Sequence, residues 1–490
     1  MGADLFSIGR SSLRTSKKSL ATTSHNIANA NTEGYSRQKI TAETNTPIAS
    51  GKNVYGTGVN VRSVKRVHDK LVEKKLNDSI SDHNYNNERT NQLSNVEEIF
   101  NEINSDGMNK ILNRFFNSFR ELSNQPENEV VRTLVRDNAN IVVKDFKRIS
   151  NSITHVKERI DTQISGIVED ANVLGATIAD LNKETTRIEN MGGETGDLRD
   201  QRDEAVRQLS ESFDINTYED EKGQYVVNIV GGGSLVAGGA VNRLKLGKIG
   251  GDEVGSYKDE SRAEIYFEAG GNQTPISASI KSGKVGALTQ TRNDEVGLLR
   301  GQLDEMAHGL VHITNAIHRK GYVNKSIPTD QNGNLINDPG AGKITGINFF
   351  KEPLQLKQAS QFLDLSDEVK ADLNNITTGL EPNSPGDNRI AIAISKVQHE
   401  KVLGEGSKTF EESYLQSIAK IGLATSKSKV NSEQSRGILA QAKSIKERVS
   451  GVSIDEEATN MVKYQQAYEA SAKMIRAADE MFDSVLGMMR

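Results

Sequence analysis

Residues 454–490 read IDEEATNMVKYQQAYEASAKMIRAADEMFDSVLGMMR. Apolar and aromatic side chains recur in this stretch every seven residues, at Ile454, Met461, Tyr468, Ile475 and Phe482. A second row, also seven apart, runs through Ala458, Gln465, Ala472, Asp479 and Leu486. Two such rows form the narrow seam of a helix that packs against another helix. The stretch therefore predicts a long helix that needs a partner.

The amino end of the chain has a similar pattern. Its apolar side chains also lie seven apart, at Phe6, Leu13, Leu20 and Ile27. Residues 1–31 hold four Lys/Arg and one Asp, a net charge of +3, whereas residues 454–490 hold four Lys/Arg and seven Asp/Glu, a net charge of −3. These charges favour an antiparallel pairing of the two ends. Because many of their residues are Ala or Ser, we expect the pair to order fully only against copies of itself or relatives.

Long apolar stripes with helical spacing fill much of the chain between these ends. They predict long helices over residues 129–190, 296–317 and 410–449, and shorter helices are expected over 88–103 and 108–122. No single stripe is wide enough to bury its own helix, so helices from distant parts of the chain must pack together. The predicted fold is mainly α: an elongated bundle of long coiled-coil-like helices from both chain halves, with paired terminal helices and inserted small β domains.

Glycine and proline mark where this helical pattern is interrupted. Two β-rich runs, at 225–230 and 263–267, lie among glycines, and five of the eight prolines fall within residues 322–388. We therefore expect four parts: a terminal-helix domain (1–35 with 454–490), a helical rod (36–213 with 286–321 and 389–453), an inserted β domain (214–285), and an excursion of loops and short strands (322–388).

Composition excludes several classes of protein. The 490 residues have a net charge of −5, which removes the electrostatic case for nucleic-acid binding. No apolar run is long enough to enter or cross a membrane, and the amino end lacks the apolar core of a cleaved signal peptide. The absence of cysteine excludes disulfides and thiolate metal sites. We expect no cofactor and no bound metal.

Two segments next to the terminal helices carry a family resemblance. Residues 26–38, NIANANTEGYSRQ, and residues 450–458, SGVSIDEEA, resemble the end signatures of the bacterial flagellar rod, hook and hook-associated proteins. In physical terms the first is a helix stop, since Asn31 and Gly34 accept left-handed backbone angles. The second begins a helix, with Ser453 as its N-cap and acidic residues in its first turn.

Within that family the chain is similar to the hook-associated proteins of the hook–filament junction. The similarity rests on residues 35–38, on the acidic and basic stretch 197–204, and on three later segments, 282–295, 318–322 and 385–388. By itself, the stretch 197–204 reads as a charged helix start held by ion pairs.

The resemblance implies a structural role and not an enzyme. Subunits would stack around a central export channel with their end helices innermost, as an adaptor layer joining the hook to the filament. Its implied partners are copies of itself, the hook protein, a second junction protein of the hook-associated protein 3 type, and a flagellar export chaperone at the carboxyl-terminal helix. The implied location is extracellular, on the flagellum, after export through the flagellar type III apparatus without a cleaved signal peptide.

The residues expected to form the assembly interface come from both ends of the chain. They are Phe6, Leu13, Leu20, Ile27, Asn29, Asn31, Gly34, Tyr35, Ile454, Met461, Tyr464, Tyr468, Ile475, Phe482 and Leu486. Their heptad rows could instead serve only the interior of one subunit, but their small apolar content favours seams between subunits.

Other functions remain open from the residues alone. The chain could be a hook or distal-rod protein of the same family, or, in a different class, an appendage-associated hydrolase. His308 and His312 lie four apart, as two metal ligands would, but they fall off the apolar seam and lack the glutamate of a zinc-protease motif. Residues 231–233 are three glycines after a strand, which indicates a turn between strands more than a phosphate cradle.

Overall fold

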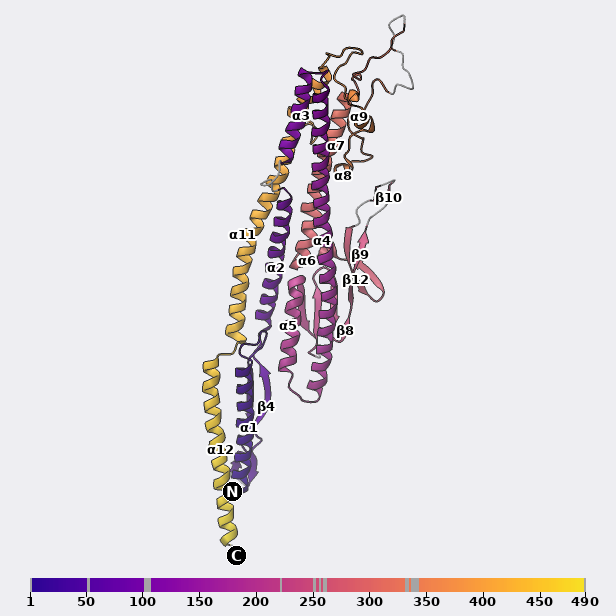
Figure 1. Ribbon diagram of the computed structural model, residues 1–490. Helices are drawn as coiled ribbons and strands as arrows, with labels where there is room; N and C mark the ends of the chain where they lie inside the picture. Colours follow the sequence, from indigo (N-terminus) through magenta and orange to yellow (C-terminus); the bar gives the residue numbers. More distant parts are fainter. Residues whose placement is uncertain are drawn as a thin grey trace. The chain divides into compact units, whose positions relative to one another are not determined.

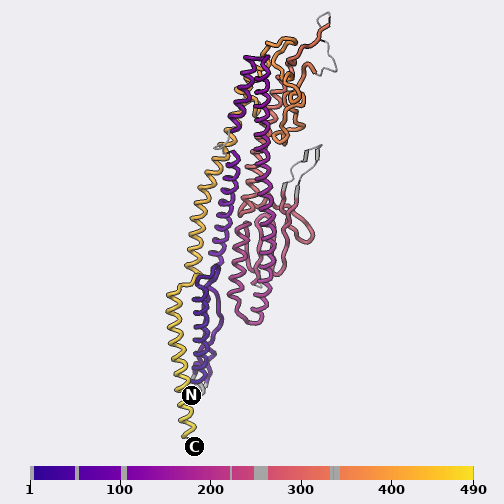
Figure 2. Tube along the Cα trace, viewed as in Figure 1, coloured from indigo at the N-terminus to yellow at the C-terminus, as the bar shows by residue number. Residues whose placement is uncertain are grey.

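The computed structural model describes residues 2–50, 53–100, 107–220, 223–249, 253–254, 257–258, 262–330, 335 and 343–488. The chain divides into two compact units. Unit 1 comprises Met1–Asn86, Ser165–Ala287 and Ser432–Arg490, and unit 2 comprises Asn87–Ile164 and Leu288–Asn431. Four helices, α2, α4, α6 and α11, contribute residues to both units (Figures 1 and 2).

The helices account for most of the described chain. They are α1 (Gly2–Ala28), α2 (Lys70–Ile99), α3 (Met108–Asn124), α4 (Glu129–Asn190), α5 (Gly196–Ser212), α6 (Gly283–Gln290), α7 (Val296–His318), α8 (Ala359–Phe362), α9 (Asp367–Ala371), α10 (Arg389–Lys396), α11 (Phe410–Ser450) and α12 (Ile454–Met488). Short 3-10 turns lie at Ser277–Ser279, Leu373–Asn375 and Val397–His399, and a π-helical turn, Thr291–Glu295, precedes α7.

The strands are short and all their pairings are antiparallel. They are β1 (Gln38–Thr44), β2 (Ile48–Ser50), β3 (Asn53–Tyr55), β4 (Val59–Arg66), β5 (Ile215–Glu219), β6 (Tyr225–Ile229), β7 (Gly233–Ala237), β8 (Ala240–Val241), β9 (Arg243–Ile249), β10 (Glu253–Val254), β11 (Tyr257–Lys258), β12 (Arg262–Ala269) and β13 (Asn272–Pro275). Among the described residues they form sheets in the orders β1-β4, β2-β3, β5-β6-β7-β8, β13-β12-β9 and β10-β11.

The long helices confirm the predicted fold class, mainly α with small antiparallel sheets. α4 has the bounds expected from its apolar stripe, and α7 and α11 differ from expectation by one residue at the carboxyl end. In α4 the stripe residues are buried, at Val142, Phe146, Ile149, Ile153, Val156, Ile160 and Ile164. The helical period of the apolar positions therefore decided these elements.

In unit 1 the two ends of the chain pair as antiparallel helices. Gly9 meets Ile475 and Ser12 meets Ser471, so residue numbers fall along α12 as they rise along α1 (Figure 1). The predicted antiparallel pairing is confirmed, but no ion pair joins α1 to α12 among their described side chains. The contact rests on close packing of small side chains instead of on the opposite charges.

Unit 1 also contains the sheet β5–β8, which is joined to the second half of α4 by one buried amide. The Asn182 side chain donates to the Tyr225 and Gly238 carbonyls at 2.9 and 2.8 Å and accepts from the Tyr225 amide at 3.0 Å. Strands β6 and β12 lie where β-rich runs were expected. Part of the predicted excursion, residues 322–388, lies outside the described residues.

Two regions of unit 1 were missed. The strands β1–β4 lie in a part of the chain that was grouped with the helical rod, and the alternating β-branched residues of β1 and β4 favour strands. α2 begins at residue 70, whereas the sequence predicted only a later helix, over 88–103, whose last three residues lie outside those described. The early turns of α2 are held by Leu76 and Ile80, which pack against Leu439 and Ala442 of α11.

Unit 2 has an aromatic interior. Phe115 and Phe119 of α3 contact Phe349, with ring centroids 5.9 and 5.4 Å apart, and Phe350 lies 5.8 Å from Phe115. Asn315 of α7 fixes the segment that carries these rings, because its Oδ1 accepts from the Phe349 and Phe350 amides at 2.9 Å each. The core of unit 2 therefore uses residues from three distant parts of the chain.

His318, at the end of α7, is fully buried in this unit and stays neutral. Its Nδ1 donates to the Ile347 carbonyl at 2.7 Å, and its Nε2 accepts from the Thr377 amide at 3.0 Å. Burial lowers the pKa of His318 from 6.5 to about 4.

We therefore expect His318 to make the protein less stable in weak acid. Between pH 6.5 and 4 the unfolded chain binds a proton at this residue that the folded chain does not, so stability falls as the pH falls. The loss from this residue is roughly 2 kcal/mol between pH 7 and 5. Urea unfolding at both pH values measures it. His318→Gln is expected to be less stable at pH 7 but to lose less on acidification; an unchanged pH dependence contradicts the assignment.

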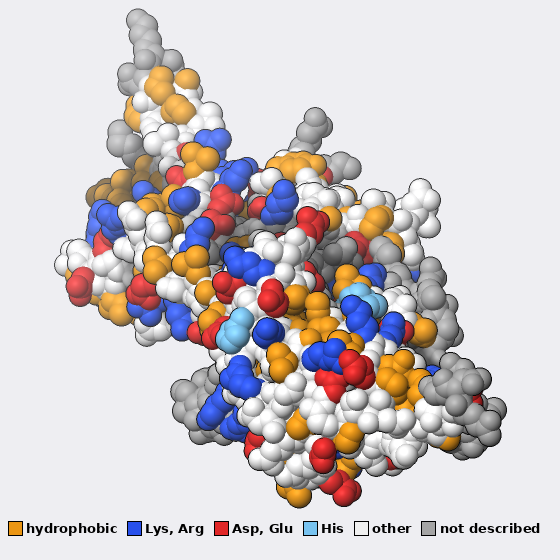
Figure 3. Space-filling model, turned by 90° about the horizontal axis from the view of Figure 1, so that it is seen from above, with side chains coloured by type: hydrophobic (Ala, Val, Ile, Leu, Met, Phe, Trp, Pro, Cys, Tyr) orange, Lys and Arg blue, Asp and Glu red, His pale blue; other side chains and the backbone are white. Residues whose placement is uncertain are grey.

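Surface charges of both signs are interspersed. On the face drawn in Figure 3, Lys and Arg side chains alternate with Asp and Glu. This mixture agrees with the nearly balanced composition of 61 basic and 66 acidic residues.

Candidate assembly site

The loop at residues 29–37, between α1 and β1, lies at the centre of the candidate site. Gly34 has a φ of +84°, and a Cβ at this position would lie 2.8 Å from the Arg207 guanidinium. The helix stop predicted at Gly34 is therefore confirmed. The left-handed angle expected at Asn31 is wrong, because Asn31 has no positive φ. The turn there is closed by hydrogen bonds, among them one from the Tyr35 amide to the Thr32 carbonyl at 3.2 Å.

Asn26, on the last turn of α1, connects this loop to the start of β1 and to α12. Its Oδ1 accepts from the Tyr35 hydroxyl at 2.8 Å and from the Gln38 amide at 2.9 Å. Its Nδ2 donates to the Gln38 carbonyl at 2.9 Å and to Glu457 of α12 at 3.2 Å. Because Asn26 is buried and uses both ends of its amide, an Asp at this position could not replace its donors.

Arg37 clamps the loop to the start of α12. Its Nε donates to Glu457 at 2.8 Å, and its two terminal nitrogens donate to Glu456 at 3.1 and 2.8 Å. Its backbone amide donates to the Ser450 carbonyl, the last residue of α11, at 2.9 Å. Ser453 caps α12 as predicted, accepting from the Glu456 amide at 3.4 Å. The acidic first turn of α12 thus serves as the docking point for an arginine from the other end of the chain.

The first turns of α5 hold the other side of the loop. Asp200 accepts from the Ser36 amide and from Arg66 of β4, both at 2.8 Å. Arg66 also donates to Asp203 at 2.5 Å, and all three side chains are buried. The ion-paired helix start expected for residues 197–204 is therefore present, and it binds the loop.

Asp197 completes the contact with α1. It accepts from the Gln38 side chain at 2.7 Å and lies 3.2 Å from the His25 Nε2. The His25 ring meets the Tyr35 ring edge-on, with centroids 5.6 Å apart. Three segments separated by more than a hundred residues, 26–38, 197–204 and 450–458, therefore meet at one place in unit 1.

The charged and phenolic groups at this site keep one protonation state near neutral pH. The hydrogen bonds that Arg37 donates to Glu456 raise the pKa of Arg37, and Arg37 in turn lowers the pKa of Glu456. Burial, followed by the charges of Asp197 and Asp200, raises the pKa of the Tyr35 phenol above its usual range. Arg37 therefore stays charged and Tyr35 stays protonated near neutral pH. Such groups bind and orient the chain, and they are poorly suited to proton transfer.

The predicted interface residues of the amino end lie on and just after α1. Leu13, Leu20 and Ile27 are half-buried, whereas Phe6 is 44% exposed. Asn29, Gly34 and Tyr35 are half-buried in the loop, and Asn31 is exposed. The fully buried row of α1 is a different one, made of small and polar residues: Gly9, Ser16, Ser19, Thr23 and Asn26.

The predicted interface residues of the carboxyl end lie along α12. Met461, Tyr464 and Ile475 are half-buried, and Ile475 contacts α1 at Gly9. The remaining four are exposed: Ile454, Tyr468, Phe482 and Leu486. The structure therefore brings the two sets together only in part, and it leaves a row of apolar side chains on the surface. That these rows are seams between subunits stays a prediction.

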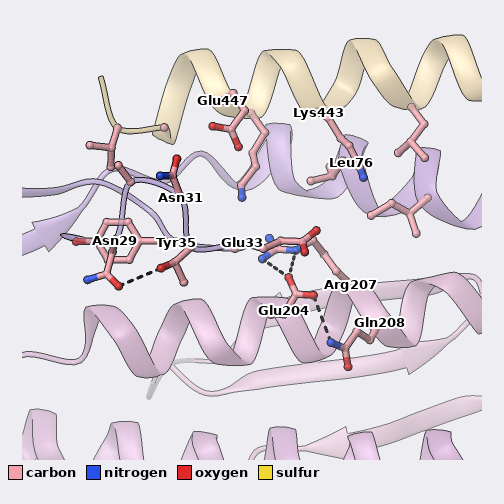
Figure 4. Close-up of a pocket in the computed structure, with 18 of the residues that line it drawn as sticks. Asn29, Asn31, Glu33, Tyr35, Leu76, Glu204, Arg207, Gln208, Lys443 and Glu447 are labelled. Carbon is pink, nitrogen blue, oxygen red and sulfur yellow. Dashed lines mark hydrogen bonds and ion pairs between the residues drawn. The ribbon is translucent and has the colours of Figure 1, made fainter. Parts of the chain in front are cut away.

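A pocket of about 370 Å³ opens beside the loop. Figure 4 shows Asn29, Asn31, Glu33 and Tyr35 of the loop between the helices α11 and α5. Leu76, Ile80 and Leu439 form the apolar part of the pocket. The charged residues that line it are Glu204, Arg207, Lys443, Lys446 and Glu447. Glu204 accepts from Arg207 at 2.9 Å and from Gln208 at 3.3 Å.

The histidine pair of α7 and the glycines at 231–233, which the sequence singled out, form no binding site among the described residues. The His308 and His312 rings lie 4.0 Å apart on α7, but the described residues contain no group of three or more potential metal ligands. The glycines at 231–233 turn the chain from β6 to β7, as expected. No described helix combines the length and apolar character needed to cross a bilayer.

Sequence reasoning missed the residues that organise the site. Asn26, Arg37, Arg66, Asp200 and Glu457 are polar and lie off the heptad rows, so apolar periodicity does not mark them. Four of these residues could have been found from their position, because they lie in the segments 26–38, 197–204 and 450–458, next to a helix end or a helix start. Arg66 had no such signal, because its strand was not expected.

Comparisons with known protein families match most of the chain in three segments. Residues 93–335 match the flagellar hook-associated protein FlgK helical domain. Residues 6–35 match the flagella basal body rod protein family, and residues 448–488 match the flagellar basal body rod FlgEFG protein C-terminal family. The amino-terminal match covers most of α1 and the loop as far as Tyr35, and the carboxyl-terminal match contains all of α12.

Curated relatives match over nearly their whole length. Flagellar hook-associated protein 1 of Bacillus subtilis is 28% identical, with 98% of this chain and 97% of the relative covered. The Salmonella typhimurium protein of the same name is 24% identical, with 99% and 100% covered. Among solved structures, the flagellar hook junction protein FlgK from Burkholderia pseudomallei is similar with a TM-score of 0.63 at 13% identity, covering 77% of this chain and 100% of that one. That similarity supports the fold.

Proposed function

We propose that this chain belongs to the family of bacterial flagellar hook-associated proteins and is a structural subunit of the layer that joins the flagellar hook to the filament. The observation that carries the proposal is the meeting of the amino-terminal, mid-chain and carboxyl-terminal segments around Asn26 and Arg37. Those contacts fix the paired helices α1 and α12 relative to α5 within unit 1. In a subunit whose terminal helices are held in this way, the exposed faces of α1 and α12 are available for contact with neighbouring subunits.

The proposed partners follow from the exposed rows on the terminal helices. We propose copies of the same chain, the hook protein, and a second junction protein of the hook-associated protein 3 type. A flagellar export chaperone would bind α12 before export. The support is the exposure of Phe6, Tyr468, Phe482 and Leu486, because apolar side chains repeated every seven residues suit a helix from another molecule.

The terminal-helix domain, 1–35 with 454–490, is the part that we propose for the axial core. The helical rod (36–213, 286–321 and 389–453) and the segments 214–285 and 322–388 would lie outside that core. The protein would act outside the cell at the hook–filament junction, after export without a cleaved signal peptide. Flagellar localisation itself follows from the relatives.

Assembly, and not catalysis, is the role that the candidate site supports. Its charged groups, including Arg37, Asp200 and Glu457, are paired with one another inside unit 1. Their pairing gives a mechanical connection between helices rather than a pocket with an acid or base poised to react.

The position of the protein on an isolated hook–basal body tests the proposal. Immunogold labelling is expected to place it only at the distal tip of the hook. The rod-family matches at the two ends leave a hook or distal-rod protein as the second candidate. Label along the hook or at the rod would support that candidate and contradict the junction.

A further inference from the structure

The pocket beside the loop at residues 29–37 has the size and lining of a small-molecule site. Its volume of about 370 Å³ lies near the lower end of the range for such sites, and residues of unit 1 alone line it. Its apolar part consists of Leu76 and Ile80 from α2 and Leu439 from α11. Figure 4 shows Leu76 and Lys443 between these two helices. The apolar part therefore suits a short hydrocarbon chain.

A buried lysine lines the same pocket. Lys446 of α11 is only 8% exposed. At steps of three and four it continues the row of Leu439 and Ala442, which packs against α2. A lysine at such a position costs stability, because its charge leaves water for a place where the helix pair otherwise buries apolar side chains.

The Lys446 ammonium has no partner within the described part of the chain. The Lys446 carbonyl accepts from the Ser450 hydroxyl at 3.2 Å, but no hydrogen bond or ion pair joins the ammonium to another described residue. A buried charge is ordinarily paired or hydrogen-bonded, since an unpaired one pays the full cost of its lost hydration. The pocket therefore contains a cation that an anion from outside the chain can satisfy.

The acidic residues of the lining do not supply that anion. Glu204 pairs with Arg207 at 2.8 Å, and Glu211 pairs with Lys284 at 2.7 Å. The other two acidic residues are exposed: Glu33 and Glu447. The charge left without a partner in the buried part of the pocket is therefore positive.

We propose that this pocket binds a small organic carboxylate with a short apolar tail. Its carboxylate pairs with the Lys446 ammonium, and its tail packs against Leu76 and Leu439. The lysine selects an anion, the apolar part selects a hydrocarbon tail, and the volume admits a small molecule. The inference does not rest on the proposed function, because the pocket lies within unit 1 of a single chain.

Titration calorimetry on the full-length protein tests the head and the tail of the ligand separately. Octanoate is the probe. Octanamide has the same tail with a neutral head, and acetate has the same head without the tail. Octanoate is expected to bind about tenfold or more tightly than either. Methyl NMR on protein labelled at Ile and Leu locates the site, because octanoate should shift the resonances of Leu76, Ile80 and Leu439.

Lys446→Met tests the proposed role of the lysine. Methionine keeps a long unbranched side chain and removes the charge, so the affinity for octanoate should fall about tenfold or more while that for octanamide stays unchanged. Retained octanamide binding also shows that the pocket is intact. Lys429→Met is the matched control, since Lys429 is exposed on α11 and does not line the pocket; it should leave the affinity for both compounds unchanged.

A preference for octanoate that disappears in Lys446→Met supports the inference. Equal affinities for octanoate and octanamide in the unaltered protein overturn it, and so do methyl shifts outside the pocket; neither result depends on a variant. A preference for octanoate that persists in Lys446→Met also overturns it. Self-association that Lys446→Met abolishes would assign the lysine to a carboxylate of a second copy and would overturn the small-molecule site.

Discussion

Deleting residues 455–490 is expected to abolish the hook–filament junction while leaving unit 2 folded. The deletion removes the helix that packs along α1, including Ser471 and Ile475, and it removes Glu456 and Glu457, which hold Arg37. Asn26 also loses a partner. Unit 2 keeps its own aromatic interior around Phe115 and Phe349, and that interior contains no residue of α12.

Motility and electron microscopy measure the first part of this expectation. Cells carrying only the truncated chain should be non-motile and should bear hooks without attached filaments. Circular dichroism and urea unfolding measure the second part, because the purified truncated chain should retain the unfolding transition of unit 2. The full-length K463E/K473E variant, whose changes lie on exposed positions of α12, should remain motile. Intact filaments on cells with the truncated chain would contradict the role given to α12.

Replacing Arg66 by alanine is expected to destabilise unit 1 by about 3–5 kcal/mol. The Arg66 guanidinium lies 2.8 Å from Asp200 and 2.5 Å from Asp203, and all three side chains are less than a tenth exposed. Burial acts to lower the pKa of Arg66, but the charge of Asp203 and the hydrogen bond that Arg66 donates to Asp200 raise it above its usual range. Arg66→Ala therefore leaves two buried carboxylates without their cation.

Arg62→Ala is the matched control on the same strand. Arg62 is largely exposed, and its nearest carboxylate, Glu43, lies at 3.8 Å, so its loss should change stability by less than about 1 kcal/mol. Urea unfolding of the two variants beside the unaltered protein measures the difference. Equal stabilities of the two variants would mean that the cluster of Arg66, Asp200 and Asp203 does not hold the loop to α5.

The terminal helices show how far the sequence could predict the candidate site. The seven-residue spacing of Leu13, Leu20, Met461 and Ile475 predicted two helices, and the opposite net charges of the two ends favoured an antiparallel pair. Both helices are present and pair in that way. The spacing did not show which face would be buried within the subunit. Small side chains such as Gly9 and Ser12 allow the backbones to approach closely, and that approach, not the apolar row, decides the inward face.

Periodicity within one segment determined the long helices, because a stripe repeated every three or four residues fixes a helix whatever it packs against. It fixed the bounds of α4 and nearly those of α7. The quoted signatures, by their order along the chain, indicated the family resemblance.

Only the tertiary structure decided what those signatures do. Asn26, Arg37, Asp200 and Glu457 are each ordinary polar residues in their own segments, and they form one site because the fold brings α1, α5 and α12 together. The same holds for the early turns of α2, whose few apolar residues are stabilised by α11. A buried polar group needs a partner of fitted geometry, and that partner comes from a distant segment that local pattern does not identify.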